Sequence, residues 1–578
     1  MCGIFSLLNY TNIPAANNAN VSDTISHWSL KKDLIETEFQ KGVARGPESS
    51  QLIFNDAQNY VQGFHRLAIN GLNDESNQPL RISKNSLSLI CNGEIYNYKE
   101  LYQMMGIKGE TDSDCEVIIH LYIKYGIDQT LRMLDGVFAF ILYTSDVIYV
   151  ARDPYGVRPL YHFYNSKTNI FGFASELKML CTFANMFESK VFQFPPGNIL
   201  QINNDKNNKW IGEIPIAYCY PTFSHNLLVD VNNDTKNNNL MMQHYLEGIY
   251  NHLYSAVKKR YLTTERPIAC LLSGGLDSSL IAAIVCDIHN KNSLFLTRKI
   301  ETYSIGLPDS EDIKYARLVA DWFGSKHTEI IVTEEEMLAA IPEVIIAIES
   351  FDVTTVRASI GNYLLGKYIK SCSNAKVIFN GDGADELCGG YLYMSSCPDS
   401  IEYDKETVRL LKDIHMFDVL RSDKSISSHG LEPRTPFLDK AFVNYYLAIP
   451  LHLRNHCING QMEKYLVRMA FSDTGLLPAC ILWRKKEAFS DGVSNKGRSL
   501  YQIIQDYIAT NNANISELNV TDLNVTDLNL RKRHLEKAYY KNIFDTAYPG
   551  QQHLTPYYWM PKYIESDDPS ARTLKTYY

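Results

Sequence analysis

Hydrophobic residues follow two different patterns along this chain. As far as about residue 200, short apolar runs such as LSLICNGEIYN, GVFAFILY, VIYVARDPYG and IFGFASE lie between Gly, Asn and Pro residues, a pattern typical of strands joined by tight turns. From about residue 240 onward, apolar residues at helical spacing (MMQHYLEGIYNHLYSAVKKRY, SLIAAIVCDI) alternate with the short runs PIACLL, TYSIGL, HTEIIV and KVIFN. This alternation predicts an α/β domain with a parallel sheet, preceded by a sheet-rich domain.

Polar, Asn-rich sequence separates the two patterns. Residues 203–239, which run from NNDKNNKW to VNNDTKNNN, are predicted to form a loop or linker. The segment LNVTDLNVTDLN is a period-five duplication, which we interpret as a tolerated loop insertion. Its N-x-T sequons would carry glycans only outside the cytosol. We therefore expect three parts: residues 2–202, the linker 203–239 and residues 240–578.

Composition and charge argue against several classes of protein. With 578 residues the chain is expected to form two or more domains, and its 45% hydrophobic and 21% charged residues are typical of a globular protein. A net charge of −9 disfavours nucleic acid or an anionic membrane surface as the main partner. No apolar run approaches the roughly 20 residues of a membrane helix, and the first residues lack the features of a signal peptide. Twelve cysteines without C-x-x-C or zinc spacing favour a reduced, cytoplasmic setting.

The run PIACLL is followed by SGGLDSS, a sequence typical of a strand, a glycine turn and the start of a helix. Gly274 and Gly275 let backbone N–H groups approach an anion, and the helix N-terminus supplies partial positive charge. Hydroxyl donors are added by Ser273, Ser278 and Ser279. An ordinary β–α turn would explain a bare SGG, and neither a Walker A loop nor a dinucleotide fingerprint is present. The whole string resembles the pyrophosphate loop of ATP pyrophosphatases, in which Asp277 would hold Mg²⁺ against the polyphosphate.

A second glycine-rich loop, NGDGADELCGG, follows the β-like run AKVIF, so it too lies at the carboxyl end of a strand, where α/β sheets bind ligands. An EF-hand is excluded, because the third and sixth positions counted from Asp382 are Ala384 and Leu387, where an oxygen ligand and a glycine are needed. An acidic turn that caps a helix remains an alternative. We prefer a metal site, in which Asp277 and Asp385 share one ion.

Cys2 follows the initiator methionine, and its small side chain permits removal of that methionine. The product would begin with a cysteine whose α-amine, of pKa roughly 8, is able to act as base for its own thiol, of pKa roughly 8.5. A cysteine at position 2 means little alone, but the strings FHRLAING, CNGEIYN and DSDCE add further groups. They supply Arg66 for a carboxylate, Asn92 and Gly93 as donors toward an oxyanion, and Asp114 for an ammonium. These groups suit the binding of glutamine during nucleophilic attack on its amide.

Many motifs, in the same order, together carry a resemblance to a known family. MCGIF, RGPE, NGEIYN, SDCE, ARDPYGVRPLY and FASELK resemble the class II, N-terminal cysteine glutamine amidotransferase domain. SGGLDSS, ESFDVTTVRAS, GDGADE, GGYLY, PRTPFLD, MEKYLVR and WRKKEAFSDGV resemble the synthetase domain of glutamine-hydrolysing asparagine synthetases. The resemblance runs from residue 2 to about 495 and resumes at the C-terminal DDPSAR. It implies an Ntn-hydrolase αββα sandwich over residues 2–202 and a doubly wound parallel-sheet ATP-pyrophosphatase domain over residues 240–578.

The resemblance also implies a reaction in two parts. Cys2 attacks the amide of glutamine, which forms a glutamyl thioester and ammonia, and water then releases glutamate. In the other domain, ATP·Mg²⁺ adenylates the side-chain carboxylate of aspartate, and ammonia arriving through an internal tunnel displaces AMP to give asparagine. ATP and Mg²⁺ are the implied cofactors. Glutamine, aspartate and ATP are the implied partners, without nucleic acid or membrane, and a homodimer is left open.

The motifs carry the family's functional residues over to this chain. The implied glutamine-binding residues are Arg66, Asn92, Gly93, Glu94 and Asp114. The implied nucleotide-binding residues are Leu272, Ser273, Gly274, Gly275, Ser278, Ile305, Asn380 and Gly381, and the implied metal ligands are Asp277 and Asp385. The residues expected around the adenylate are Thr354, Arg357, Asp382, Asp418 and Lys486. The implied catalytic residues are Cys2, Asn92, Gly93, Asp382 and Lys486. Structural roles are the alternatives for single residues, such as a surface charge for Arg66, a helix cap for Asp114 and a salt bridge for Arg357.

The second loop departs from the family pattern S-G-E-G-S-D-E. Asn380 and Ala384 replace serines, and Asp382 replaces the glutamate that is placed to take a proton as ammonia attacks. In the first domain, Ala44 replaces a common histidine and Asn70 lies in a usually apolar stretch. An aspartate is one methylene shorter than a glutamate, so we predict a slow ammonia-transfer step, because a displacement of about 1 Å can cost about 100-fold in rate.

Two other functions stay open at this point. One is a related ATP-dependent amidotransferase or ligase that acts on another acid, as β-lactam synthetase does. The other is a decayed, non-catalytic synthetase, for which Asp382 and Ala384 are the supporting residues. Pyrophosphate release tested across several amino acids distinguishes the first alternative, and retention of Met1, which would block the amine of Cys2, favours the second.

Overall fold

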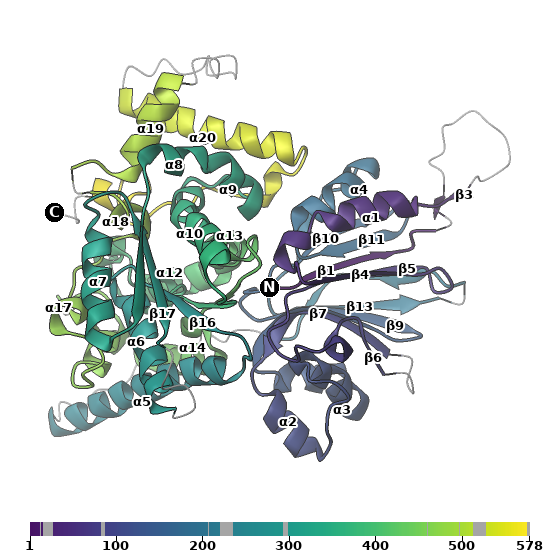
Figure 1. Ribbon diagram of the computed structural model, residues 1–578, viewed down its shortest axis with the longest axis horizontal. Coiled ribbons are helices and arrows are strands. Elements are labelled where there is room, and N and C mark those ends of the chain that lie inside the picture. Colours follow the sequence, from purple (N-terminus) through teal and green to yellow (C-terminus); the bar gives the residue numbers. More distant parts are fainter. Residues whose placement is uncertain are drawn as a thin grey trace. The chain divides into compact units, whose positions relative to one another are not determined.

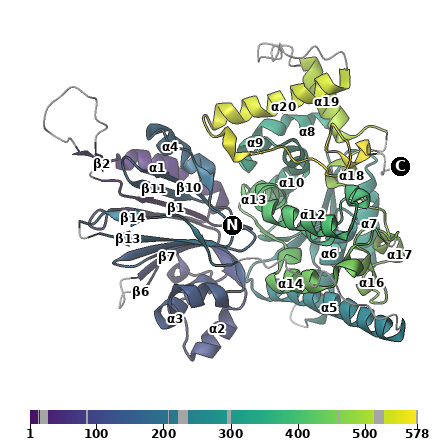
Figure 2. The same cartoon turned by 180° about the vertical axis from the view of Figure 1, so that it is seen from behind.

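The protein consists of two compact units. The computed structural model describes residues 1–11, 13–14, 27–82, 87–205, 207–219, 235–292, 299–458, 460–495, 497–511 and 528–574. The first unit contains Met1–Pro221, Ser427–Leu431 and Asp545–Pro556, and the second contains Thr222–Ile426, Glu432–Phe544 and Tyr557–Tyr578. Figures 1 and 2 show the elements of both units from two sides.

The first unit extends beyond residue 202, where the sequence places its end. Strands β14 (Trp210–Gly212) and β15 (Ile216–Ala217) both pair antiparallel with β13 (Asn198–Asn204), so part of the expected linker belongs to a sheet. Trp210 is fully buried in this sheet. Residues 206 and 220–234 of the expected linker lie outside the described residues, as do residues 518–527 of the duplication.

The first unit is a sandwich of two antiparallel sheets with helices on both outer faces. One sheet has the strand order β12-β10-β11-β1-β5-β4, and the other has the order β14-β13-β9-β8-β7-β6 with β15 also paired to β13. Figure 1 shows α1 and α4 beside the first sheet and α2 and α3 beside the second. The αββα sandwich predicted for this part of the chain is confirmed.

The strands of the first sheet are β1 (Gly3–Leu8), β4 (Ser49–Asn55), β5 (Tyr60–Arg66), β10 (Tyr161–Asn165), β11 (Ile170–Ala174) and β12 (Phe192–Gln193). The second sheet adds β6 (Leu80–Ile82), β7 (Leu87–Ile95), β8 (Gly136–Tyr143) and β9 (Val147–Arg152) to β13, β14 and β15. A separate pair is formed by β2 (Ile13–Pro14) and β3 (His27–Trp28). The helices are α1 (Lys32–Gln40), α2 (Tyr98–Met105), α3 (Val117–Met133) and α4 (Cys181–Met186).

Strand β8 shows how the sequence builds these layers. Side chains in a strand alternate between its two faces. Ala139, Ile141 and Tyr143 accordingly pack in the core between the two sheets. Phe138 and Phe140, with Leu142, pack with residues of α2 and α3 on the outer face of the second sheet. The run GVFAFILY is apolar at every position from Val137 because both of its faces are covered.

The second unit is built on a five-stranded parallel sheet in the order β18-β17-β16-β19-β20. These strands are β16 (Ile268–Leu271), β17 (Glu301–Gly306), β18 (Lys326–Ile331), β19 (Val377–Phe379) and β20 (Glu432–Arg434). The chain moves outward from β16 to β18 and then returns to β19, which creates a topological switch point between β16 and β19. Figure 1 shows α6 and α7 on one face of the sheet and α10 on the other. The predicted doubly wound parallel sheet is confirmed.

The helices that begin in the second unit are α5 (Thr235–Leu262), α6 (Leu276–Lys291), α7 (Glu311–Phe323), α8 (Glu334–Ala339), α9 (Ile341–Ile348), α10 (Val353–Cys372), α11 (Ala384–Cys388), α12 (Ser400–Asp413), α13 (Asp418–Ser427), α14 (Lys440–Ala448), α15 (Leu451–Arg454), α16 (Tyr465–Ala470), α17 (Ala479–Leu482), α18 (Phe489–Gly492), α19 (Leu500–Asn511) and α20 (Leu528–Ala547). Within the described ranges, none of the helices is both long and apolar enough to span a membrane.

Candidate active site

The two glycine-rich loops lie side by side at the switch point of the parallel sheet. The SGGLDSS loop follows β16 and the NGDGADE loop follows β19, and these two strands pair directly, with Cys270 opposite Phe379. Gly381 packs so tightly against the first loop that a Cβ atom on it would lie 2.7 Å from the Cβ of Asp277. The juxtaposition expected from the strand-end positions is therefore present, and it depends on a glycine at position 381.

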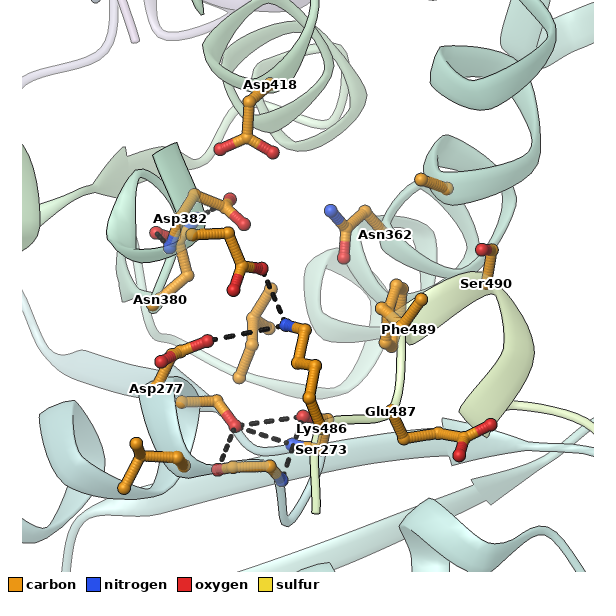
Figure 3. Close-up of a pocket in the computed structure, with 18 of the residues that line it drawn as sticks. Ser273, Asp277, Asn362, Asn380, Asp382, Asp418, Lys486, Glu487, Phe489 and Ser490 are labelled. Atoms are coloured by element: carbon orange, nitrogen blue, oxygen red, sulfur yellow. Dashed lines mark hydrogen bonds and ion pairs between the residues drawn. The ribbon is translucent and has the colours of Figure 1, made fainter. Parts of the chain in front are cut away.

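One cavity, of about 200 Å³, opens between these loops and the neighbouring helices. Most residues predicted for the nucleotide, the metal and the adenylate line it together: Leu272, Ser273, Gly275, Asp277, Ser278, Ile305, Thr354, Asn380, Gly381, Asp382, Asp385, Asp418 and Lys486. Gly274 and Arg357 are the two predicted residues that do not line it. Figure 3 shows how the lining side chains converge.

The first loop has the local geometry of an anion-binding turn. Gly274 has a φ of 74°, in the left-handed region, and a Cβ there would lie 2.5 Å from the backbone N of Ala316. Helix α6 begins just after Gly275, so its first backbone N–H groups point toward the cavity edge. The Ser278 hydroxyl accepts a hydrogen bond from the backbone N of Ser273 at 3.1 Å, which closes the turn. Gly274 thus shapes the loop without lining the cavity.

Two lysines join the acids of the two loops. Lys464 Nζ lies 2.5 Å from a carboxylate oxygen of Asp277 and 2.5 Å from one of Asp385. Lys486 Nζ lies 2.6 Å from Asp385 and 3.6 Å from Asp277. Figure 3 shows its contact with Asp277. Among the described residues, no group of three or more His, Cys, Asp and Glu side chains is arranged to hold a metal ion. Two carboxylates and two ammonium groups therefore face the same space.

The lysines set the protonation of this cluster. Burial alone would raise the pKa of Asp385, but Lys464 and Lys486 outweigh burial and hold that pKa well below its usual range. Burial would likewise lower the pKa of Lys486, but Asp385 and Asp277 outweigh it and raise that pKa above its ordinary value. Asp385 is thus a carboxylate and Lys486 an ammonium at neutral pH.

A second acidic group lies on the other wall of the cavity. The Asp382 carboxylate accepts a hydrogen bond from Asn380 Nδ2 at 2.7 Å and lies 3.6 Å from Arg421, which also pairs with Asp418. The carboxylate of Asp418 accepts from the backbone N of Gly383 at 3.0 Å. Burial, with the negative charge of Asp418, raises the pKa of Asp382 to about 6. A carboxyl group of this kind exchanges a proton near neutral pH.

Thr354 supplies a polar group that has no hydrogen-bond partner among the described residues. It lies in the first turn of α10, where the N-terminal residue Asp352 accepts a hydrogen bond from the backbone N of Thr355 at 2.8 Å. The Thr354 hydroxyl is buried, lines the cavity and makes no hydrogen bond within the described part of the chain. Buried hydroxyl groups are almost always hydrogen-bonded, so this group is suited to a ligand in the cavity.

Arg357 was expected near the adenylate, but it does not line the cavity. Its guanidinium is 4% exposed and forms paired hydrogen bonds with Glu536 at 2.8 and 2.6 Å and with Asp568 at 2.8 and 2.9 Å. Arg357 is one helical turn from Thr354 on α10, but it is directed into this ion-pair network rather than the cavity. The salt-bridge alternative considered for this residue describes its position correctly.

Several further polar residues of the cavity were not predicted from the sequence, among them Lys464, Arg484, Asn362 and Arg421. Lys464 and Arg484 belong to the motifs MEKYLVR and WRKKEAFSDGV, so their motifs were signals that could have found them. Arg484 pairs with Asp312 at 2.9 Å and its guanidinium lies 4.0 Å from the ring centre of Tyr315. Asn362 and Arg421 line the cavity from the middle of α10 and from α13, and no local pattern marks them.

In the first unit, Cys2 lies just before β1, beside the end of β5. Its thiol donates to the carbonyl of Leu67 at 3.5 Å, and its own carbonyl accepts a hydrogen bond from Arg45 Nε at 2.9 Å. The side chain packs at the edge of the core between the two sheets. Met1 carries the ammonium group, which donates to the carbonyl of Leu431 at 3.3 Å. The nitrogen of Cys2 becomes an amine only when Met1 is removed.

Asn92 and Glu94 lie on the face of β7 that points to this inter-sheet layer, since they alternate with Ile90, a member of the same core as Cys2. Asn92 is fully buried, and neither its amide oxygen nor its amide nitrogen has a hydrogen-bond partner in the described structure. Glu94 accepts from Asn70 Nδ2 at 2.9 Å, so Asn70 makes a polar contact in the stretch where an apolar residue is usual. The orphaned amide of Asn92 is a ready donor for a ligand.

Arg66 and Asp114 complete the predicted group, and both are buried. Arg66 donates to the carbonyl of Asn73 at 2.9 Å and to Asn77 Oδ1 at 2.8 Å, which excludes the surface-charge alternative. The Asp114 carboxylate accepts a hydrogen bond at 2.7 Å from the backbone N of Ile95, the last residue of β7. A Cβ on Gly93 would lie 2.6 Å from the carbonyl of Val137, so this position needs glycine.

Comparisons with known proteins give the following matches. The model of the glutamine amidotransferase domain matches residues 1–194, and the model of the asparagine synthase family matches residues 248–402 and 397–560. The glutamine-hydrolyzing asparagine synthetase of Gallus gallus is 41% identical over 548 residues, which covers 92% of this chain and 94% of the relative. The enzymes of the same name from Cricetulus griseus and Homo sapiens are 40% and 39% identical over 551 and 554 residues, with the same coverage.

Proposed function

We propose, from the finding that this chain belongs to the glutamine-hydrolysing asparagine synthetase family, that it makes asparagine from aspartate with ATP and with ammonia released from glutamine. The products are AMP, pyrophosphate and glutamate. The observation that carries the proposal is the cavity of the second unit, in which two strand-end loops, two carboxylates and two lysines converge beside the unpartnered hydroxyl of Thr354. Glutamine, aspartate and ATP are thus the proposed substrates.

In the first unit, Cys2 is the proposed nucleophile. After removal of Met1, its α-amine takes the thiol proton and the sulfur attacks the carboxamide carbon of glutamine, which gives a tetrahedral oxyanion. The amide of Asn92 and the backbone N–H of Gly93 are the proposed donors to this oxyanion, and the buried, unpartnered state of the Asn92 side chain supports that role. Ammonia leaves, a thioester remains on the sulfur, and water releases glutamate.

The remaining predicted residues of the first unit are proposed to hold glutamine. Arg66 would bind its α-carboxylate, and Asp114 would bind its α-ammonium, with Glu94 beside it. These three side chains are buried and already hydrogen-bonded to the backbone or to Asn70. Such contacts hold the charged ends in fixed rotamers before the ligand arrives, which lowers the entropic cost of binding.

In the second unit, the SGGLDSS loop and the start of α6 are proposed to bind the polyphosphate of ATP. Asp277 and Asp385 fit a magnesium site, because Mg²⁺ is usually held by one or two carboxylates together with substrate phosphates. When bound, Mg²⁺ would neutralise phosphate charge next to these two acids. Lys464 and Lys486 offer further positive charge where pyrophosphate would form, and the raised pKa of Lys486 keeps it charged.

The opposite wall is proposed to hold aspartate and its adenylate. Thr354 offers a hydroxyl that has no hydrogen-bond partner in the described part of the chain, and Asp418 and Arg421 form an ion pair there. Asp382 is the proposed acceptor of the proton that ammonia loses as it attacks the acyl carbon of the adenylate. Its pKa of about 6, raised by burial and by Asp418, lets it stay ionised at neutral pH and still bind a proton readily. Arg357 has no part in this scheme, because its guanidinium is taken up by Glu536 and Asp568.

The function is tested by measuring asparagine and pyrophosphate together, with either glutamine or ammonium as nitrogen source. We expect equal amounts of both products from either source, and pyrophosphate that depends on aspartate. The same assay with other amino acids in place of aspartate distinguishes a related ligase. Absence of pyrophosphate with aspartate, or its release with a different acid only, would contradict the proposal.

Lengthening Asp382 is predicted to speed the ammonia-transfer step. The change Asp382→Glu moves the carboxylate about one methylene further from the backbone, and because a displacement of about 1 Å can change a rate about 100-fold, we expect asparagine formation to rise by up to about that factor. Glutaminase activity measured without ATP should not change. Asp321→Glu, at an exposed position of α7, is the matched control and should leave both activities unaltered. An unchanged or lower rate of synthesis in Asp382→Glu would remove Asp382 from the proton-acceptor role.

A further inference from the structure

The C-terminal motif DDPSAR, residues 567–572, has no role in the scheme above, although several of its side chains are buried and hydrogen-bonded. Every second residue of the motif is buried: the exposed fraction is 1% for Asp568, 7% for Ser570 and 7% for Arg572. Each of them contacts a different piece of chain that lines the nucleotide cavity or adjoins it. We call residues 568–572 the C-terminal strap. Its own turn is closed by Thr573 Oγ1, which donates to the carbonyl of Ser570 at 2.7 Å.

The first contact of the C-terminal strap holds α10. Asp568 accepts hydrogen bonds from both terminal nitrogens of Arg357, at 2.8 and 2.9 Å, and Glu536 of α20 pairs with the same guanidinium. Arg357 is flanked on α10 by Thr354 and Ala358, which line the cavity. The start of α10 has another link to the same end of the chain, because Asp352 Oδ1 accepts from the backbone N of Trp559 at 2.7 Å. The helix that presents Thr354 is therefore attached to C-terminal residues at both of these points.

The second and third contacts hold the segment that contains Lys486. The Ser570 hydroxyl donates to Asp491 of α18 at 2.8 Å, directly after Phe489 and Ser490 of the cavity wall. Arg572 Nε donates to Glu487 at 2.8 Å, and its Nη1 donates to the carbonyl of Asn495 at 2.8 Å. Arg572 thus forms hydrogen bonds with the first and the last residue of the segment 487–495.

The direction of the Glu487 side chain explains how its contact with Arg572 affects the cavity. Figure 3 shows that Lys486 points toward Asp277, whereas Glu487, its neighbour in the chain, points away. The hydrogen bond from Arg572 to Glu487 therefore fixes the backbone next to Lys486, whose side chain extends to Asp385 at 2.6 Å. On its other side the segment is held by α7 and the turn before it, through Ser310, whose hydroxyl donates to the carbonyl of Gly492 at 2.9 Å, and through Arg484, which pairs with Asp312. Of the anchors named here, the C-terminal strap is the one that contacts both this segment, at Glu487, and α10, at Arg357.

We propose that the C-terminal strap positions two walls of the cavity for adenylation, the Lys486 segment through Arg572 and Ser570, and the start of α10 through Asp568. The proposal rests on the proposed function of the cavity. Asp568, Ser570 and Arg572 are positioning residues, since they act through Arg357, Asp491 and Glu487 and do not line the cavity. The docked C-terminal strap thereby helps to hold Lys486 and Thr354 in their relative positions.

The test is the change Arg572→Gln in the full-length chain, with Arg572→Lys as the conservative variant. Misplacement of about 1 Å can cost about 100-fold in rate, so we expect kcat for ammonium-dependent synthesis to fall about 10- to 100-fold in Arg572→Gln, with a smaller change in KM for ATP. Arg572→Lys should recover part of kcat, because an ammonium can pair with Glu487 but cannot also reach the carbonyl of Asn495. Glutaminase activity, which depends on Cys2, should stay at the original rate in both.

A matched control is Arg317→Gln, which breaks an exposed Arg–Glu pair in the same unit and should change neither kcat nor KM. Hydrogen exchange provides an independent readout that does not need activity. In Arg572→Gln, the amides of residues 484–495 should exchange faster, whereas those of β16 and β17 should not change. The hydrogen-exchange measurement still tests the role of the C-terminal strap if the original protein makes no asparagine. That outcome would refute the proposed function but not the role of the C-terminal strap.

The proposal is overturned if Arg572→Gln keeps its kcat within about twofold, or if exchange at residues 484–495 is unaltered. It is also overturned if glutaminase activity falls in parallel with synthesis, since that result indicates general damage. If Arg572→Gln does not fold, as judged by loss of its thermal transition, the variant Ser570→Ala tests the proposal instead. That variant removes one hydroxyl donor to Asp491 and should lower kcat several-fold without loss of glutaminase; an unchanged kcat would count against the C-terminal strap.

Discussion

Replacing Cys2 with alanine is expected to abolish asparagine formation from glutamine and to leave formation from ammonium at its original rate. The thiol is the proposed nucleophile, and removal of a nucleophile commonly lowers kcat by about 10⁴-fold or more. The cavity with Lys486 and Asp382 belongs to the other compact unit, so its own chemistry does not require the thiol. The measurement is asparagine production with each nitrogen source at saturating ATP and aspartate.

Two controls sharpen the Cys2 experiment. Cys181→Ala removes a different thiol of the first unit, a buried one on α4, and should leave both reactions unchanged. The intact mass of the purified protein should lack one methionine, because the amine of Cys2 is free only without Met1. Equal loss of glutamine- and ammonium-dependent synthesis in Cys2→Ala would contradict the division into two reactions, and so would full glutaminase activity in a protein that retains Met1.

Replacing Lys486 with methionine is expected to stop synthesis from either nitrogen source and to spare glutaminase activity. The side chain keeps its length but loses the charge that faces the departing pyrophosphate, and loss of one such stabilising group costs about 10²- to 10³-fold in kcat. The fold should survive, because Lys464 still pairs with both Asp277 and Asp385 at 2.5 Å. Pyrophosphate release at saturating ammonium is the direct measurement.

The position of Lys486 also allows a graded series. Lys486→Arg retains the charge, but a planar guanidinium does not fit the place of a compact ammonium that touches Asp385 at 2.6 Å, so we expect an intermediate rate. Lys367→Ala, at an exposed lysine of α10 that pairs with Glu343, is the control and should have no effect. Pyrophosphate release that stays normal in Lys486→Met would exclude this lysine from adenylation.

The candidate site was only partly predictable from the sequence. The two glycine-rich loops follow strands in the sequence, and parallel strands end at one edge of a sheet, so their meeting beside β16 and β19 could be expected. That they touch depends on Gly381, whose missing side chain lets it approach Asp277. The pairing of Asp277 and Asp385 with Lys464 was not expected, because Lys464 lies 187 residues from Asp277 in the chain.

For Arg357 and the DDPSAR motif, too, the contacts depend on residues that are distant in sequence. The sequence places Arg357 three residues after Thr354, and a helix puts such residues near one another, which made a shared cavity a reasonable interpretation. The partners that decide its direction, Glu536 and Asp568, are 179 and 211 residues away. DDPSAR was noted as a motif, but its contacts with α10, α18 and Glu487 exist only in the folded chain.

The sequence by itself determined the main apolar strands of both units, the order of the domains and the loops that end the central strands, because these features depend on periodicity and turn residues within about ten positions. It also indicated the family, through many short motifs in one order. Only the tertiary structure decided which charged groups meet, namely Lys464 with the acids of two loops and Arg357 with the C-terminal strap. It also decided that β14 and β15 pair with β13. The charged pairs join segments that are distant in sequence, and a buried charge takes whichever opposite charge the packing brings within reach.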